Sequence, residues 1–209
     1  MPERTEYAHG TPSWVDLGTT DVTGAETFYS GIFGWEAERM PAGDGIYSMQ
    51  NVRGISAAGI YEQPEEQKAA GMQPAWTTYF SVDDVDATTS KVVPAGGRVM
   101  MEAFDVMDVG RMSVIGDPTG ATLALWQAKD GGRASLTGEH GAVSWNELMS
   151  SDAEKSKAFF EEVLEVTHNS DPNMGGYTMM MANGPPVAGV VQRSEQMPRC
   201  FALAGLLCS

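Results

Sequence analysis

The sequence predicts an α+β protein assembled from βαβββ units, each consisting of one strand, one helix and three short strands. Three observations support this prediction: an internal repeat at a nearly constant offset, helices with clear start and stop signals, and strands whose apolar residues alternate. The 209 residues, 42% of them hydrophobic, are enough for one large or two small domains with a sizeable core.

The repeat is clearest between the first and last thirds of the chain. The segment Trp14–Leu17 recurs as Trp145–Leu148. Further pairs follow at offsets of 131 and then 130 residues: Asp21 with Asp152, Phe28 with Phe159, Tyr47 with Tyr177, and Ala58-Gly59 with Ala188-Gly189. Many matched positions at one offset indicate a duplicated structural unit.

A weaker repeat lies within the first part of the chain, where Pro12-Ser-Trp14 resembles Pro74-Ala-Trp76. We therefore expect units at 12–61, 74–128 and 142–192. The Gly-rich polar segment 129–141 is expected to be a linker. This gives one complete domain at 12–128 and a single further unit at 142–192.

Start and stop signals define three helices. Asp21 is expected to cap the first helix, which ends at Gly34, and Asp152 the equivalent helix in the third unit. The middle helix is expected to run from Asp84 to Val93, before Pro94. Apolar residues at helical spacing form a core-facing side on the outer two helices. These residues are Ala25, Phe28, Tyr29, Ile32 and Phe33 in the first, and Ala158, Phe159, Val163 and Leu164 in the last.

The strands have two different faces. Trp14 and Asp16 share one face of the first strand, and Val15 and Leu17 share the other. The apolar face is expected to lie under the helix, while the mixed face would line a cavity on a curved sheet. Asp117–Gly120 is a turn signal between strands at 111–115 and 121–127.

Charge and composition exclude several classes of function. With 13 Lys+Arg against 28 Asp+Glu, the formal charge is −15, which argues against binding to nucleic acid or to anionic membranes. The N-terminal segment has no apolar signal region, and both cysteines lie in the last ten residues. We expect no membrane segment, no disulfide framework and a cytoplasmic location.

Residues 12–192 resemble the vicinal oxygen chelate superfamily, which includes glyoxalase I, bleomycin-resistance proteins and extradiol dioxygenases. The resemblance rests on the motifs FYSGIFGW at 28–35, AGGR at 95–98 and GRMSVIGDPTG at 110–120. The opening 21 residues and the stretch 103–120 are most similar to the tandem glyoxalase-like culture-filtrate antigens of mycobacteria. The resemblance implies paired βαβββ units that form an open eight-stranded cup around a small-ligand site, followed here by an incomplete second copy.

The sequence departs from this pattern after the third unit, because no fourth unit follows. Residues 193–209 are interpreted as an aberrant or truncated tail, or alternatively as a short apolar strand that packs elsewhere. The third unit is then expected to expose an apolar face or to find a partner, for instance in a homodimer.

The resemblance also implies positions for a divalent metal, and these positions carry unsuitable residues. They correspond to Trp14, Thr77 and Ala124, with Trp145 equivalent in the third unit. None is a good ligand for Zn²⁺, Ni²⁺ or Fe²⁺. The three histidines, His9, His140 and His168, are expected in surface loops. We therefore predict no metal and no cofactor.

The predicted pocket lies on the mixed face, and its residues are Trp14, Asp16, Thr77, Tyr79, Arg111, Ala124 and Trp126. Asp16, and Glu147 by the repeat, are the candidate acids. Asp16 has two possible roles. In the structural role it hydrogen-bonds only to protein groups; in the functional role it binds a polar ligand or acts as a general base. Arg111, if it lies opposite Trp126, either packs on the indole ring or clamps an anionic group of a ligand.

Three functions are compatible with these residues. The first is a metal-free cup that binds a small organic molecule. The second is a glyoxalase-type lyase or isomerase acting on an oxoaldehyde or its thiol adduct, with Asp16 or Glu147 as the base. The third is a non-functional truncated product that aggregates or is degraded from about residue 142.

Overall fold

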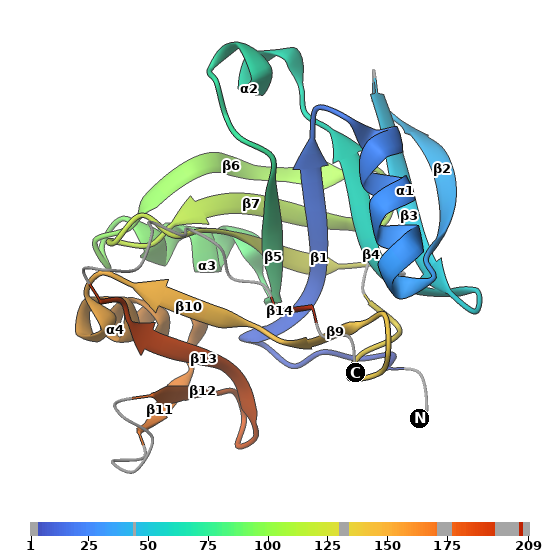
Figure 1. The fold of residues 1–209 in the computed structure, drawn as a ribbon. Helices are drawn as coiled ribbons and strands as arrows, with labels where there is room; N and C mark the ends of the chain where they lie inside the picture. The colour runs from blue at the N-terminus through green and yellow to red at the C-terminus, as the bar shows by residue number, and fades with distance from the viewer. Residues whose placement is uncertain (1–3, 44, 130–133, 171–176, 195–204, 207–209) are drawn as a thin grey trace.

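The computed structural model describes residues 4–43, 45–129, 134–170, 177–194 and 205–206. Its main feature is an eight-stranded mixed sheet in the order β2-β3-β4-β1-β5-β8-β7-β6 (Figure 1). The strands are β1 (Thr11–Thr19), β2 (Glu36–Ala42), β3 (Gly45–Val52), β4 (Ile55–Glu62), β5 (Ala75–Ser81), β6 (Arg98–Val106), β7 (Gly110–Gly116) and β8 (Thr122–Ala128). The predicted α+β fold is confirmed, and the curved sheet does not close into a barrel.

The two halves of this sheet have the same topology. In the first half β1 pairs in parallel with β4, and in the second β5 pairs in parallel with β8. The halves meet where β1 and β5 pair antiparallel, so the starting strands of both units lie side by side at the centre of the sheet.

The predicted helix signals are confirmed. Helix α1 (Val22–Phe33) is capped by Asp21 and ends at Gly34, which is left-handed with φ 69°. Asp84 and Asp152 cap α3 (Val85–Val92) and α4 (Ala153–Leu164). The remaining helix, α2 (Glu65–Ala69), is a single short turn that the sequence did not predict.

The predicted apolar face of α1 is partly wrong. Phe33 is buried, but Phe28 is 59% and Ile32 43% exposed. The reason lies beneath the helix, where polar residues of β3 reach it: the Glu26 carboxylate accepts a hydrogen bond from Ser48, and Gln50 donates to the same Ser48 hydroxyl. The helix is therefore rotated so that Glu26, rather than Phe28, faces the sheet.

The third unit forms a separate four-stranded sheet in the order β10-β13-β12-β11, covered by α4. Its strands are β10 (Glu147–Ser150), β11 (Thr167–Ser170), β12 (Thr178–Met181) and β13 (Pro186–Gln192), preceded by β9 (Val143–Trp145). Helix α4 packs beside α3 (Figure 1), and Phe159 and Phe160 join Phe80 of β5 in one hydrophobic core. Burial of this apolar surface holds the unit against the large sheet.

A buried polar network joins the same two parts. Asp117, at the β7–β8 turn, is fully buried and accepts a hydrogen bond of 2.6 Å from the Ser156 hydroxyl on α4. Ser156 also contacts Ser150 at 2.8 Å. Because the Ser156 hydroxyl and the Asp117 carboxylate are both buried, the hydrogen bond between them depends on the docked position of the third unit.

The described part of the segment predicted as a linker packs against the first unit. Ala134 and Leu136 are buried, and their backbone N–H groups donate to Ser13 and Ser56. Trp35 donates from Nε1 to the Gly141 carbonyl. Residues 134–142 thus fill a gap beside β1 and β4, although their composition is polar and Gly-rich.

Most of the predicted aberrant tail lies outside the described residues. Its described residues are Arg193, Ser194 and β14 (Gly205–Leu206), and β14 pairs antiparallel with β9. Among the residues described, no helix combines the length and apolar character that a membrane span requires.

Candidate functional site

One face of the large sheet carries nearly all the residues that the sequence predicts for the pocket. Trp14 pairs with Tyr79, Asp16 pairs with Thr77, and Tyr79 pairs with Ala124. Paired residues in a sheet project to the same side, and Trp126 follows Ala124 by two positions. Six of the seven predicted residues therefore share the face opposite α1 and α3.

Asp16 is the centre of a hydrogen-bond chain on this face. The Tyr79 hydroxyl donates to Asp16 Oδ2 at 2.7 Å, and the Tyr47 hydroxyl donates to the same oxygen at 3.4 Å. Trp14 Nε1 in turn donates to the Tyr47 hydroxyl at 2.7 Å. Asp16 is only 2% exposed, and its other oxygen, Oδ1, is buried without a hydrogen-bond partner.

Glycines make room for the tyrosine hydroxyls. Gly59 pairs with Asp16 across β1 and β4, and a Cβ atom there would collide with the Tyr47 hydroxyl. Gly18 pairs with Tyr61 in the same way. A Cβ atom at Gly18 would lie only 2.7 Å from the Tyr61 hydroxyl. A side chain at either glycine would push a phenol away from the carboxylate.

Burial dominates the electrostatics of the group. It raises the pKa of Asp16 from 3.8 to about 7, although the hydrogen bonds from Tyr79 and Tyr47 act in the opposite direction. Burial together with the Asp16 charge raises the pKa values of Tyr47 and Tyr79 well above 10. The tyrosines thus remain hydrogen-bond donors, while the Asp16 carboxyl exchanges a proton near neutral pH.

The sequence analysis missed Tyr47 and Tyr61 as members of this group. They lie on β3 and β4 and pair with each other. One signal was available for Tyr47, since it recurs as Tyr177 at the offset of the repeat. No signal marked Tyr61, because its place depends on the long-range register between β1 and β4.

The predicted position of Arg111 in the pocket is wrong. Arg111 pairs with Gln127, while Met112 pairs with Trp126, so the β7–β8 register differs by one residue from the expected one. A shift of one residue moves a side chain to the opposite face. Arg111 instead binds Asp86 of α3 through two hydrogen bonds of 2.7 and 2.8 Å, which raise its pKa.

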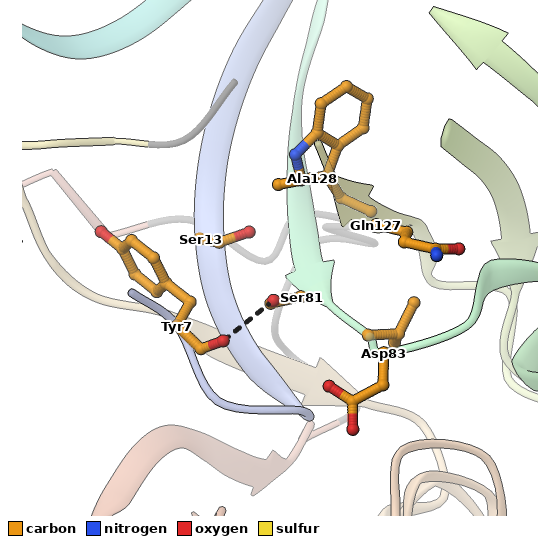
Figure 2. Close-up of a pocket in the computed structure, with 8 residues that line it drawn as sticks. Tyr7, Ser13, Ser81, Asp83, Gln127 and Ala128 are labelled. Atoms are coloured by element: carbon orange, nitrogen blue, oxygen red, sulfur yellow. Dashed lines mark hydrogen bonds between the residues drawn. The ribbon is translucent and has the colours of Figure 1, made fainter. Parts of the chain in front are cut away.

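A pocket of about 270 Å³ lies at the ends of β5 and β8 (Figure 2). Its lining residues are Tyr7, Ser13, Ser81, Val82, Asp83, Trp126, Gln127 and Ala128. The Ser81 hydroxyl donates to the Tyr7 carbonyl, and the Trp126 ring meets Tyr79 edge-on with 6.2 Å between centroids. Tyr79 therefore connects Asp16 to a wall of this pocket, and Trp126 Nε1 is buried without a partner.

The residues on this face do not fit a divalent metal. Trp14, Thr77 and Ala124 occupy the positions that the resemblance implies for metal ligands, and they offer an indole, a hydroxyl and a methyl group. Among the described residues, no three His, Cys, Asp or Glu side chains gather closely enough to hold a metal ion. Of the three histidines, His168 contacts Glu161 in the third unit, and His140 is exposed in a turn. His9 contacts Asp83, one of the residues that line the pocket.

Glu147, the other candidate acid, lies on β10 in the small sheet, so the structure does not bring it together with Asp16. Each acid lies opposite a glycine on the neighbouring parallel strand: Asp16 opposite Gly59, and Glu147 opposite Gly189. The two acids therefore occupy equivalent places in two separate sheets.

Comparison with known proteins agrees with the fold described above. Residues 11–125 match the Glyoxalase/Bleomycin resistance protein/Dioxygenase superfamily, and the chain belongs to that family. It is 46% identical over 196 residues to CFP32 of Mycobacterium tuberculosis, provisionally named a glyoxylase, covering 92% of this chain and 75% of that protein. It is 35% identical to the anthracycline biosynthesis protein DauV of Streptomyces sp. strain C5, covering 88% of this chain and 72% of DauV.

Solved structures share the fold at low sequence identity. The Mn(II)-bound glyoxalase of Novosphingobium aromaticivorans aligns with a TM-score of 0.60 and 15% identity, over 88% of this chain and 62% of that one. A homoprotocatechuate 2,3-dioxygenase from B. fuscum aligns with the same score and identity, over 90% of this chain and 55% of the dioxygenase. The chain thus spans less than two thirds of either structure.

Proposed function

We propose that the Asp16 face binds a small organic molecule that carries an acidic hydroxyl, such as a phenol, an enol or a hydroxyketone, without a metal. The observation that supports this most directly is the Asp16 carboxyl, which is buried and keeps Oδ1 without a partner. The same burial raises the pKa of Asp16 to about 7. A ligand hydroxyl that donates to Oδ1 would remove an unsatisfied buried acceptor.

The surroundings favour an aromatic ligand. Trp14, Tyr47, Tyr61 and Tyr79 lie on the same face as Trp126, which lines the pocket, and aromatic side chains suit flat rings. The relationship to an anthracycline biosynthesis protein is consistent with an aromatic hydroxyl compound as the ligand class.

The proposal is tested by titrating the protein with 4-nitrophenol and following tryptophan fluorescence. The wild type is expected to bind, and Asp16→Asn and Tyr79→Phe are expected to weaken binding about tenfold through lost hydrogen bonds. Asp108→Asn, at an exposed acid outside this face, is the matched control and should bind like the wild type. Equal affinity of the wild type and Asp16→Asn would refute the role of Asp16.

A second candidate function is a glyoxalase-type lyase or isomerase acting on an oxoaldehyde or its thiol adduct. It is favoured by the same pKa of about 7, because a general base works best when its pKa lies near the working pH. The 46% identity to a protein provisionally named a glyoxylase supports the same reaction class.

An enzyme assay separates the two functions. If this second function holds, the hemithioacetal of methylglyoxal and a small thiol is converted to a thioester, the reaction is unaffected by EDTA, and Asp16→Asn abolishes it. If the protein only binds its ligand, no thioester forms with the wild type. Activity that EDTA removes would contradict the metal-free site.

A further inference from the structure

The third unit contains a group of residues arranged like those around Asp16. Trp145 Nε1 donates to the Tyr177 hydroxyl at 2.7 Å, the same distance as between Trp14 and Tyr47. Tyr177 lies close enough to Glu147 for the carboxylate to add to the effect of burial in raising the Tyr177 pKa, as Asp16 does for Tyr47. A Cβ atom at Gly189 would collide with Tyr177, just as one at Gly59 would collide with Tyr47.

The strands around this second group also follow the first sheet. β10 pairs in parallel with β13, as β1 does with β4, and β13, β12 and β11 continue antiparallel, as β4, β3 and β2 do. β14 pairs antiparallel with β9 at Trp145, in the place that β5 takes beside Trp14. The tryptophan, the acid and the tyrosine therefore occupy matching positions in matching topologies.

One donor differs between the two groups. Trp14 pairs with Tyr79, whose phenol donates to Asp16, whereas Trp145 pairs with Gly205. Among the described residues, Glu147 therefore has Tyr177 on one side and no counterpart of Tyr79 on the other, and it is half-buried where Asp16 is buried. In the first sheet a phenol fills the corresponding space, which shows what kind of group fits beside such a carboxylate.

We propose that Trp145, Glu147 and Tyr177 form a second binding site that takes a phenolic hydroxyl compound, with the ligand hydroxyl donating to Glu147 where Tyr79 donates to Asp16. This inference rests on the proposed function for its ligand class, but it concerns separate residues on a separate sheet. Because Glu147 is half-buried and Asp16 is buried, we expect the second site to accept larger ligands than the first.

The test is calorimetric titration of the full chain with 4-nitrophenol, which gives the number of sites. We expect two sites in the wild type, one in Glu147→Gln, one in Asp16→Asn and none in the double variant. At the second site Tyr177→Phe should weaken binding about tenfold, since it removes only a hydroxyl. Glu161→Gln, an exposed acid on α4, is the matched control.

The outcomes distinguish the two proposals. A single site that Asp16→Asn abolishes and Glu147→Gln leaves intact overturns the second site and supports the first. A single site with the reverse sensitivity overturns the Asp16 proposal and supports the second. No binding by a wild type with normal thermal unfolding overturns both. If Glu147→Gln unfolds, Tyr177→Phe and the wild-type stoichiometry still decide the question.

Discussion

At the scale of single residues, Asp16 combines burial with an incomplete set of hydrogen bonds. Two tyrosine hydroxyls satisfy Oδ2, while Oδ1 has none. Burying a carboxylate in this way is unfavourable unless it is protonated or paired. The fold therefore holds a group whose charge depends on pH and on what donates to Oδ1.

The first prediction concerns the pH dependence of stability. Because folding raises the pKa of Asp16 from 3.8 to about 7, the folded state holds a proton that the unfolded state has released in that range. Stability should fall as pH rises from about 4 to about 7, by up to about 4 kcal/mol, and this contribution should not change further above pH 7.

Asp16→Asn removes this pH dependence, because its amide carries no charge. Urea unfolding of both proteins at pH 5 and pH 8 measures the difference. The variant should gain stability relative to the wild type on going from pH 5 to pH 8. If the two proteins lose stability in parallel across this range, Asp16 does not titrate as described.

At the scale of elements, Gly59 on β4 leaves the space that the Tyr47 phenol of β3 occupies beside Asp16 of β1. Local signals in the sequence predicted a large part of this arrangement. Asp21, Asp84 and Asp152 cap their helices through bonds to residues three positions away, so their role is visible in short segments. The alternation that places Trp14 beside Asp16 is equally local.

The predictions that were wrong or missing depend on the register between strands that are distant in the sequence. The Asp117 N–H donates to the Ala121 carbonyl, and the Asp117 carboxylate binds the N–H groups of Thr119 and Ala121. The turn therefore spans one residue more than the sequence signal indicated, which moves Arg111 to the helix side. Tyr79 was predicted beside Asp16, but Tyr47 and Tyr61 reach it through the pairing of β3 with β4 and of β4 with β1, which no short segment encodes.

The second prediction tests the role of glycine at this contact. Gly59→Ala should destabilise the protein by about 1–3 kcal/mol, because its Cβ atom meets the Tyr47 phenol in a packed sheet. Gly31→Ala on α1 is the control: no atom lies within 4 Å of its added Cβ, and it should stabilise the helix by about 0.5–1 kcal/mol. Thermal unfolding measures both, and similar midpoints would contradict the packing described.

At the scale of the whole molecule, one sheet of two units and one sheet of a single unit share a core. Phe159 and Phe160 bury against the large sheet, and Ser156 binds Asp117 at the same junction. The third unit is therefore held by apolar packing and by a polar network together, and it gains little from the exposed ion pairs nearby.

The third prediction addresses this junction. Ser156→Ala leaves the buried Asp117 carboxylate with one donor fewer and should destabilise the protein by about 1–3 kcal/mol. Ser90→Ala, at an exposed serine on α3, is the control. Hydrogen exchange of the α4 amides should be faster in Ser156→Ala than in the control, and equal protection in the two variants would show that the network does not hold the unit.

The most direct test of the central claim is a ¹³C NMR titration of the aspartate carboxyl carbons, with and without 4-nitrophenol. We expect one carboxyl that titrates near pH 7, is missing from Asp16→Asn, and changes its shift and its midpoint when the phenol binds. If Asp16 titrates in the ordinary range of aspartate, or if its signal is indifferent to the phenol, the Asp16 carboxyl is not the group that binds the ligand.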